Sequence, residues 1–167
     1  MKISKILFVF VSLSLMLAFS ACSDDDDKEV VNPIVGTWSF SSVVADEVEL
    51  SDNYYKERIE NFLEKRGESD FGSFTYTFTA DNKVTLVDLD GSGVGTYTFK
   101  DGKLTIVWGE DDYDTYYASL GNGVLYIYED YLEMLNDLEL IDFIHLSIND
   151  LSLDFHKAVV KMTFVKQ

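Results

Sequence analysis

Histidine and cysteine, which often carry nucleophilic and acid–base catalysis, are scarce in this sequence. Its two histidines, His145 and His156, stand eleven positions apart and do not fit the H-E-x-x-H spacing that places two imidazoles on one zinc ion. The segment "GSGVG" (91–95) is typical of a turn between strands and lacks the G-x-S-x-G pattern of a serine nucleophile. We therefore predict no catalytic residue, no cofactor and no enzymatic activity.

Two acidic runs have the residue types that gather cations. "DLDGSG" (88–93) places two aspartates beside a glycine turn, and "GEDDYD" (109–114) offers four carboxylates. The first lacks the third acid and the distal glutamate that complete a calcium loop. Both runs fall where hairpin loops are expected, and acidic loops are common on a strongly acidic protein. The sequence predicts no metal site.

The only cysteine, Cys22, follows a short apolar segment. Residues 1–5 carry two lysines, and the fourteen residues 6–19 are almost entirely apolar. A helix of that length rises about 21 Å, which is less than the roughly 30 Å of a bilayer core. Residues 1–21 therefore have the pattern of a signal peptide. The sequence "FSAC" resembles the lipobox of bacterial lipoproteins, which implies that Cys22 is lipidated and becomes the mature N-terminus.

A serine and four aspartates follow the cysteine directly: Ser23, Asp24, Asp25, Asp26 and Asp27. They resemble the export signal of Bacteroidetes surface lipoproteins, which implies an outer membrane lipoprotein displayed at the cell surface. An acidic tether over residues 22–33, on a protein anchored toward the periplasm, explains the same composition. In both cases the lipid bilayer is the partner of the acylated N-terminus.

The composition limits the partners of the rest of the chain. The 13 basic residues stand against 30 acidic ones, for a formal net charge of −17, and loss of residues 1–21 would remove two of the lysines. Such a surface repels nucleic acid, because phosphates are bound by clustered Lys and Arg. Residues 34–167 are sufficient for one domain with a hydrophobic core.

From residue 34 onward, apolar and polar residues alternate with the period of β-strands. "FTYTFT" alternates aromatic residues with threonines, and "GTYTFK" and "KLTIVW" flank the hairpin dipeptide "DG". Eight segments follow this pattern: 34–43, 74–79, 83–89, 95–100, 103–108, 113–120, 124–130 and 157–166. Because short turns join nearly all of them, we predict an all-β fold, an eight-stranded antiparallel up-and-down barrel whose closure removes the exposed edges.

Two segments depart from the strand pattern. Residues 51–66 predict a helical insert after the first strand, with an N-cap at Ser51 or Asp52 and an end at Gly67. Residues 130–146 show helical spacing before the last strand. Residues 143–155 also alternate well enough to form a hairpin, and the sequence leaves both alternatives open.

The start of the first strand carries a recognisable motif. Gly36, Thr37 and Trp38 form the G-x-W that opens lipocalins and fatty-acid-binding proteins. Over residues 34–167 the chain resembles the lipocalin-like domains of Bacteroidetes lipoproteins, in which phrases such as "GTYTFKDGKLTI" recur. In lipocalins a basic side chain near the last strand covers this tryptophan, so the resemblance implies Lys157 or Lys161 here, and a structural role for the tryptophan at the barrel floor.

The barrel interior is the remaining candidate site. A closed eight-stranded barrel holds one small ligand or is filled by side chains, and the sequence leaves both open. The aromatic strands and the insert supply the candidate ligand-binding residues Trp38, Tyr55, Ile59, Phe62, Tyr76, Phe78, Tyr97, Trp108 and Tyr126. The apolar face of the insert is expected to act as a lid.

The arginines limit the charge of the ligand. Arg58 and Arg66 both fall on the predicted insert, so no arginine remains to hold a ligand carboxylate inside the barrel. We therefore predict a small apolar or neutral ligand. A solid barrel that recognises a protein or glycan partner is the second hypothesis, and a hydrolase with an unfamiliar site is the third.

Overall fold

The computed structural model describes residues 32–138, 145–146, 148 and 153–167. The predicted signal peptide, Cys22 and the acidic run 23–27 lie outside these residues. Within them, none of the helices combines the length and the apolar character needed to span a bilayer.

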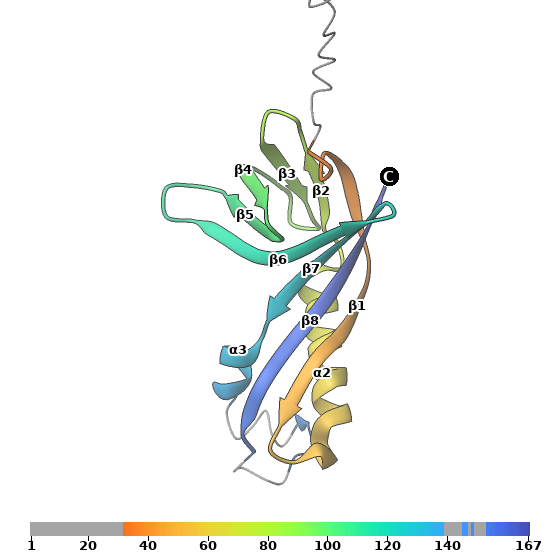
Figure 1. Cartoon of the computed structure of the whole chain (residues 1–167). Helices are drawn as coiled ribbons and strands as arrows, with labels where there is room; N and C mark the ends of the chain where they lie inside the picture. Colours follow the sequence, from red (N-terminus) through yellow and green to blue (C-terminus); the bar gives the residue numbers. More distant parts are fainter. Residues whose placement is uncertain (1–31, 139–144, 147, 149–152) are drawn as a thin grey trace, which may run out of the picture. The chain divides into compact units, whose positions relative to one another are not determined.

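Eight antiparallel strands form a closed barrel in the order of the sequence (Figure 1). They are β1 (Gly36–Leu50), β2 (Thr75–Phe78), β3 (Lys83–Val87), β4 (Ser92–Lys100), β5 (Lys103–Val107), β6 (Tyr113–Gly121), β7 (Val124–Asp130) and β8 (Phe155–Lys166). The barrel closes where β1 pairs with β8. The predicted up-and-down barrel is confirmed, and each predicted strand overlaps an observed one.

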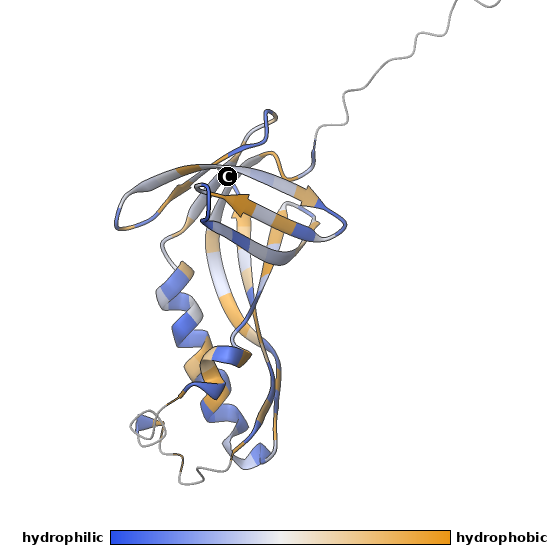
Figure 2. Ribbon diagram, turned by 90° about the vertical axis from the view of Figure 1, so that its left-hand side faces the viewer, coloured by the Kyte–Doolittle hydropathy of each residue, from blue (hydrophilic) through white to orange (hydrophobic). Residues whose placement is uncertain are grey.

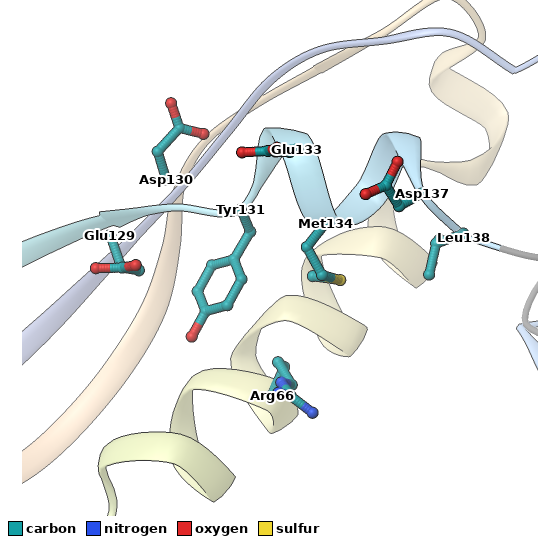
Figure 3. A pocket seen from close by; sticks show the side chains of 8 residues that line it. All are labelled: Arg66, Glu129, Asp130, Tyr131, Glu133, Met134, Asp137 and Leu138. Atoms are coloured by element: carbon teal, nitrogen blue, oxygen red, sulfur yellow. The ribbon is translucent and has the colours of Figure 1, made fainter. Parts of the chain in front are cut away.

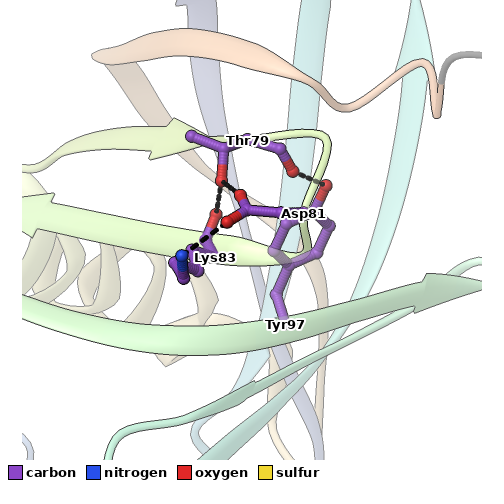
Figure 4. Close-up of polar contacts among 4 residues, drawn as sticks. All are labelled: Thr79, Asp81, Lys83 and Tyr97. Atoms are coloured by element: carbon purple, nitrogen blue, oxygen red, sulfur yellow. Dashed lines mark hydrogen bonds and ion pairs between the residues drawn. The ribbon is translucent and has the colours of Figure 1, made fainter.

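Tight hairpins close one end of the barrel. Asp101 and Gly102 have φ angles of 53° and 75°, and Asn122 and Gly123 have 52° and 76°. Positive φ at both central residues makes two-residue turns that match the twist of the strands. The turn between β2 and β3 is tied by side chains: Asp81 contacts Thr79 and Lys83, and the Tyr97 hydroxyl donates to the Thr79 carbonyl at 3.0 Å (Figure 4).

Strand β1 is longer than the sequence pattern predicted. Together with β8 it continues past the barrel as a two-stranded ribbon (Figure 1). Strand β2 pairs only with Gly36–Ser39, whereas β8 pairs with β1 as far as Leu50. The prediction that the first strand ends at residue 43 is wrong. Three register shifts interrupt the pairing of β1, and each shift breaks the alternation by which a strand is recognised.

The predicted helical insert is confirmed, but its end is not where the sequence indicated. A 3-10 turn, η1 (Asn53–Tyr55), leads into α2 (Lys56–Phe71), and the Asp52 carboxylate accepts a hydrogen bond from the Tyr54 amide at 2.8 Å. Gly67 lies inside the helix. A Cβ there would stand 2.9 Å from Cγ2 of Val43 and 3.3 Å from Cγ1 of Val160, so glycine allows α2 to lie directly on the ribbon.

A short helix, α3 (Leu132–Asn136), precedes the last strand. The predicted helix over 130–146 is therefore present in part: Asp137 and Leu138 fall outside α3, and His145 is helical again. Residues 139–144, 147 and 149–152 lie outside the described part of the chain, so the choice between helix and hairpin over 143–155 stays a prediction.

The buried side chains form two clusters. The barrel core includes Trp38, Tyr76, Phe78, Tyr97 and Phe164. The ribbon core lies between α2, α3 and the two long strands and includes Val48, Ile59, Leu63, Leu135 and Val160. Figure 2 shows α2 alongside the long strands, with apolar residues on both. The barrel is thus stabilised by its own core, and the ribbon by the helices that cover it.

Candidate functional site

Aromatic rings fill the closed half of the barrel. The Tyr76 and Phe78 rings stack with their centroids 5.7 Å apart, and the Tyr97 ring meets Phe78 edge-on at 4.8 Å. These residues were predicted to bind a ligand, and they instead pack against one another in the barrel core. For this half of the barrel, the structure decides the open question in favour of a filled interior.

Trp38 closes the barrel floor, as its family motif implied. Its indole N–H donates to the Ile34 carbonyl at 2.7 Å, and the Lys166 Nζ lies 5.3 Å from the ring centroid. The prediction that Lys157 or Lys161 covers this ring is wrong, because the pairing of β1 with β8 places Lys166 opposite Trp38. The two other lysines form ion pairs with acidic residues of β1.

The apolar face of α2 does not act as a lid over the barrel. Tyr55 and Ile59 are buried in the ribbon core, and Phe62 packs against its edge. Only the last residue of the helix, Phe71, reaches the barrel core. Tyr126 is half-buried on β7 between Leu125 and Ile127, whose side chains point into the barrel, so its own side chain faces outward.

Trp108 lies at the other end of the barrel, which we call the mouth. It follows β5, and its ring covers two glycines of β4: a Cβ on Gly95 would stand 2.9 Å from Cε3 of Trp108, and one on Gly93 would stand 3.7 Å away. The indole N–H donates to Oδ2 of Asp114 at 2.6 Å. Trp108 is thus a predicted ligand-binding aromatic residue that the structure places at the mouth.

Five side chains from four segments meet there and form what we call the mouth cluster: Tyr76, Trp108, Asp114, Tyr116 and Glu129. Asp114 and Tyr116 share one face of β6, and the pairing of Tyr117 with Tyr128 places Glu129 beside Tyr116. The Phe71 ring closes one side, with its centroid 6.4 Å from that of Tyr116.

Two tyrosine hydroxyls of the cluster have no hydrogen-bond partner among the residues that the structure describes. Tyr76 is 1% exposed and Tyr116 is 9% exposed. In this part of the chain, every side-chain N or O atom that is fully buried has a hydrogen-bond partner. Since the Tyr76 and Tyr116 hydroxyl oxygens have none, both must be accessible to water. Burial is the largest cause that raises the pKa of each hydroxyl. The Asp114 and Glu129 carboxylates raise it further at both residues, after Tyr76 in the case of Tyr116, so both hydroxyls stay protonated.

Glu129 is the most perturbed acid of the described chain. It is half-buried, and it forms no hydrogen bond or ion pair with another described residue. Burial, followed by the negative charges of Asp114, Asp130 and Asp70, raises the pKa of its carboxyl to about 7. Near neutral pH this carboxyl is therefore divided between its protonated and ionised forms.

One residue of the mouth cluster, Glu129, also lines a surface groove of about 620 Å³ between α2 and the corner where β7 meets α3. Its lining residues are Arg66, Glu129, Asp130, Tyr131, Glu133, Met134, Asp137 and Leu138 (Figure 3). One carboxylate joins the two sides of the groove. Oδ2 of Asp70 accepts from Arg66 Nε at 3.0 Å and from the Tyr131 hydroxyl at 3.1 Å.

Comparison with known proteins identifies the fold. A model of the family described as "Lipocalin-like domain" matches residues 34–127, more than half of the chain. The chain belongs to this family. A crystal structure of a DUF4847 family protein from Bacteroides vulgatus ATCC 8482 is similar at 13% identity and a TM-score of 0.39, covering 83% of this chain and 97% of that chain. None of the curated proteins matches the chain.

Membership in the lipocalin-like family fits the binding of a small ligand, since this is typically a fold for binding rather than for catalysis.

The first acidic run, residues 88–93, has a local structural role. Oδ1 of Asp88 accepts from the amides of Asp90 and Gly91 at 2.8 and 2.9 Å and so shapes the turn between β3 and β4. Over the described residues, no group of three metal-ligating side chains is arranged to hold an ion.

The sequence prediction missed Asp114 and Glu129 as residues of the lipocalin-like barrel site. Asp114 was counted in the acidic run 109–114 as well as in the predicted strand 113–120, and it lies on β6 with its side chain in phase with Tyr116. Glu129 continues the inward phase of Leu125 and Ile127. Both residues already fell within the predicted strands 113–120 and 124–130, and only the register that tells which alternating set points inward was missing.

Proposed function

We propose that this protein is a membrane-anchored lipoprotein whose lipocalin-like barrel binds a small, largely apolar ligand at its mouth. The groove that meets the mouth cluster carries this proposal. Its volume of about 620 Å³ lies within the roughly 300–1,000 Å³ of small-molecule sites. Aromatic and thioether side chains of the groove, Tyr131 and Met134 among them, offer the apolar contacts.

The expectation from the sequence, a ligand between the helical insert at 51–66 and the strand ends beside it, is retained in this proposal. The deep interior is occupied by stacked rings, so a ligand would bind between α2 and the β7–α3 corner. The hydrogen bond from the Tyr131 hydroxyl to Asp70 joins the two walls of this groove, and Arg66 bonds the same carboxylate from within α2. A preformed groove loses little entropy when a ligand enters it.

Titration with an uncharged apolar dye, N-phenyl-1-naphthylamine, tests the groove. The full mature chain carrying Cys22→Ala would be used, so that the protein stays in solution. Fluorescence should rise on binding, and Met134→Trp should reduce the affinity at least tenfold by filling the groove. Tyr126→Leu, on the outer face of β7, is the matched control and should bind normally. A dye that fails to bind, or that binds Met134→Trp unchanged, would refute the groove as the site.

Anchoring is proposed from the sequence. Cys22→Ala should abolish processing of the signal peptide and release the protein from the membrane fraction. Retention of a normally processed Cys22→Ala protein in membranes would contradict lipidation.

Surface display is proposed for the same anchored protein. Replacing residues 24–27 by alanine should keep the lipid anchor but protect the protein from protease added to intact cells. Unchanged cleavage of this variant would leave only the tether role for the acidic run.

Recognition of a protein or glycan partner is the second candidate function, and one surface favours it. The outer face of β4–β6 carries Val94, Tyr113 and Tyr117 at 65%, 67% and 75% exposure. Exposed tyrosines next to valine are typical of binding surfaces. If this surface is the site, replacing both tyrosines by serine should abolish binding to a glycan array or a cell surface, whereas Met134→Trp should not affect it.

A further inference from the structure

The charges at the mouth are not balanced by the protein. Asp114 and Glu129 form no ion pair within the described part of the chain, and Arg66 already bonds Asp70. The groove beside them is lined by three further carboxylates, from Asp130, Glu133 and Asp137, and by Arg66 as its single basic side chain. A molecule in the groove therefore meets an excess of negative charge.

The tyrosine hydroxyls are a second, independent sign of a ligand. The Tyr76 side chain is almost completely buried, yet its hydroxyl has no hydrogen-bond partner in the described chain. The negative charges of Asp114 and Glu129 act on this hydroxyl. The hydroxyl oxygen reaches space that water can enter, so its hydrogen-bonding capacity is open to solvent or to a bound molecule. A polar group of a ligand at the mouth would supply the missing partner for Tyr76 and for Tyr116.

The aromatic faces indicate what kind of positive charge fits. The Trp108 indole bonds Asp114, the pairing of β6 with β7 sets Tyr116 beside Glu129, and the face of an aromatic ring attracts an alkylammonium group. A bare metal ion needs several converging oxygen ligands, and the described residues contain no group of three that could hold one. The site thus combines carboxylates with rings in the way that suits an organic cation.

We infer that the mouth cluster binds an organic cation, an apolar molecule that carries one protonated amine or quaternary ammonium group. The inference rests on the proposed function and specifies its ligand. The charged group lies between the Asp114 and Glu129 carboxylates, donates N–H to the Tyr76 hydroxyl where it has one, and leaves its apolar part in the groove. This replaces the neutral ligand predicted from the sequence, because the scarcity of arginine argued only against anions.

Three probes with the same aromatic body and different charge test the inference. They are 1-naphthylmethylammonium, 1-naphthylmethanol and 1-naphthoate, titrated at pH 8 onto the mature chain with Cys22→Ala by isothermal calorimetry. The ammonium should bind at least about tenfold more tightly than the alcohol, since a cation near a partly desolvated carboxylate and a ring gains from both. The naphthoate should bind most weakly.

Matched variants connect the preference to the cluster. Glu129→Gln and Asp114→Asn should each weaken ammonium binding about tenfold and leave the alcohol unchanged. Asparagine keeps an oxygen that accepts from the Trp108 indole, so this variant preserves the local packing. Glu57→Gln removes an exposed carboxylate in the first turn of α2 and should change nothing. Near-ultraviolet circular dichroism confirms that each variant is folded.

The outcomes separate the inference from the proposed function. Equal binding of the alcohol and the ammonium, or tighter binding of the naphthoate, overturns the cation inference and leaves the groove as a site for uncharged molecules. The same conclusion follows if the uncharged dye binds and none of the three probes does. If neither the dye nor any probe binds, the proposed function fails as well.

Discussion

Glu129 has a carboxyl that is harder to ionise in the folded protein than in the unfolded chain. Its environment contains negative charges from three segments and one arginine that is already engaged. The titratable and charged groups that face it are Asp114 and Tyr116 on β6, Asp70 and Arg66 on α2, Tyr76 on β2, and Asp130 and Tyr131 on its own segment. The nearest residue across β8 is the apolar Val160. Burial and these charges therefore oppose ionisation.

The direction in which Glu129 changes the free energy of unfolding follows from the shift of its pKa. The pKa of Glu129 rises from 4.5 to about 7 on folding, so between these values the folded state holds a proton that the unfolded state has released. The stabilisation from this proton is fully present below pH 4.5 and is lost as the pH rises through 7. Ionised Glu129 therefore lowers the free energy of unfolding above pH 7.

The size of the effect is set by the shift and by solvent. One pKa unit corresponds to about 1.4 kcal/mol, so the complete shift would correspond to about 3 kcal/mol. Glu129 is only half-buried, and water screens its interactions, so we expect about 1–2 kcal/mol. Glutamine at this position has nearly the same shape and no charge.

Urea denaturation of wild type and Glu129→Gln measures this effect directly. The two proteins should have similar free energies of unfolding at pH 4.5, and the variant should be more stable by about 1–2 kcal/mol at pH 8. Glu57→Gln, which removes an exposed carboxylate, should show no such change between the two pH values. A difference between wild type and Glu129→Gln that is the same at both pH values would refute the assignment of a raised pKa to Glu129.

Other predictions concern packing and ligand binding. Gly95→Ala should lower the free energy of unfolding by roughly 1–3 kcal/mol in urea, because the added Cβ would lie 2.5 Å from the Val107 carbonyl oxygen; an unchanged midpoint would contradict this contact. Leu63→Ala should cost about 2–5 kcal/mol by leaving a cavity in the ribbon core, and a loss below 1 kcal/mol would show that α2 packs loosely. Calorimetry should show that the affinity for 1-naphthylmethylammonium falls several-fold from pH 8 to pH 5, as Glu129 gains its proton, and Glu129→Gln should remove this dependence.

The strands of the barrel were predictable because their chemistry is local. Threonines alternate with aromatic residues in "FTYTFT", and the turn at Asp101 and Gly102 has the positive φ angles that its sequence favours. The second half of β1 was missed because bulges break its alternation. Gly67 was misassigned for a related reason. Glycine usually ends a helix, but here it permits a close contact with Val43 that only the tertiary structure reveals.

The mouth cluster was only partly predictable from the sequence. Tyr76 and Trp108 were named as candidates from their residue type, but the two carboxylates were not. The cluster unites residues between positions 76 and 129, and whether a side chain points inward depends on the register of each strand. Acidic residues near strand ends are also common on the surface of an acidic protein. Residue type alone therefore could not separate Asp114 and Glu129 from the other acids.

Stability and binding are connected through Glu129. Above pH 7 its ionised carboxylate destabilises the folded protein in the absence of a partner. A cation bound beside it would favour the ionised form, lower its pKa and recover the lost free energy. The same residue thus weakens the free protein and strengthens the complex. Binding of an ammonium probe should therefore raise the melting temperature more at pH 8 than at pH 5, and should release protons near pH 7. An uncharged probe at the same degree of saturation should do neither, which separates occupation of the groove from recognition of charge.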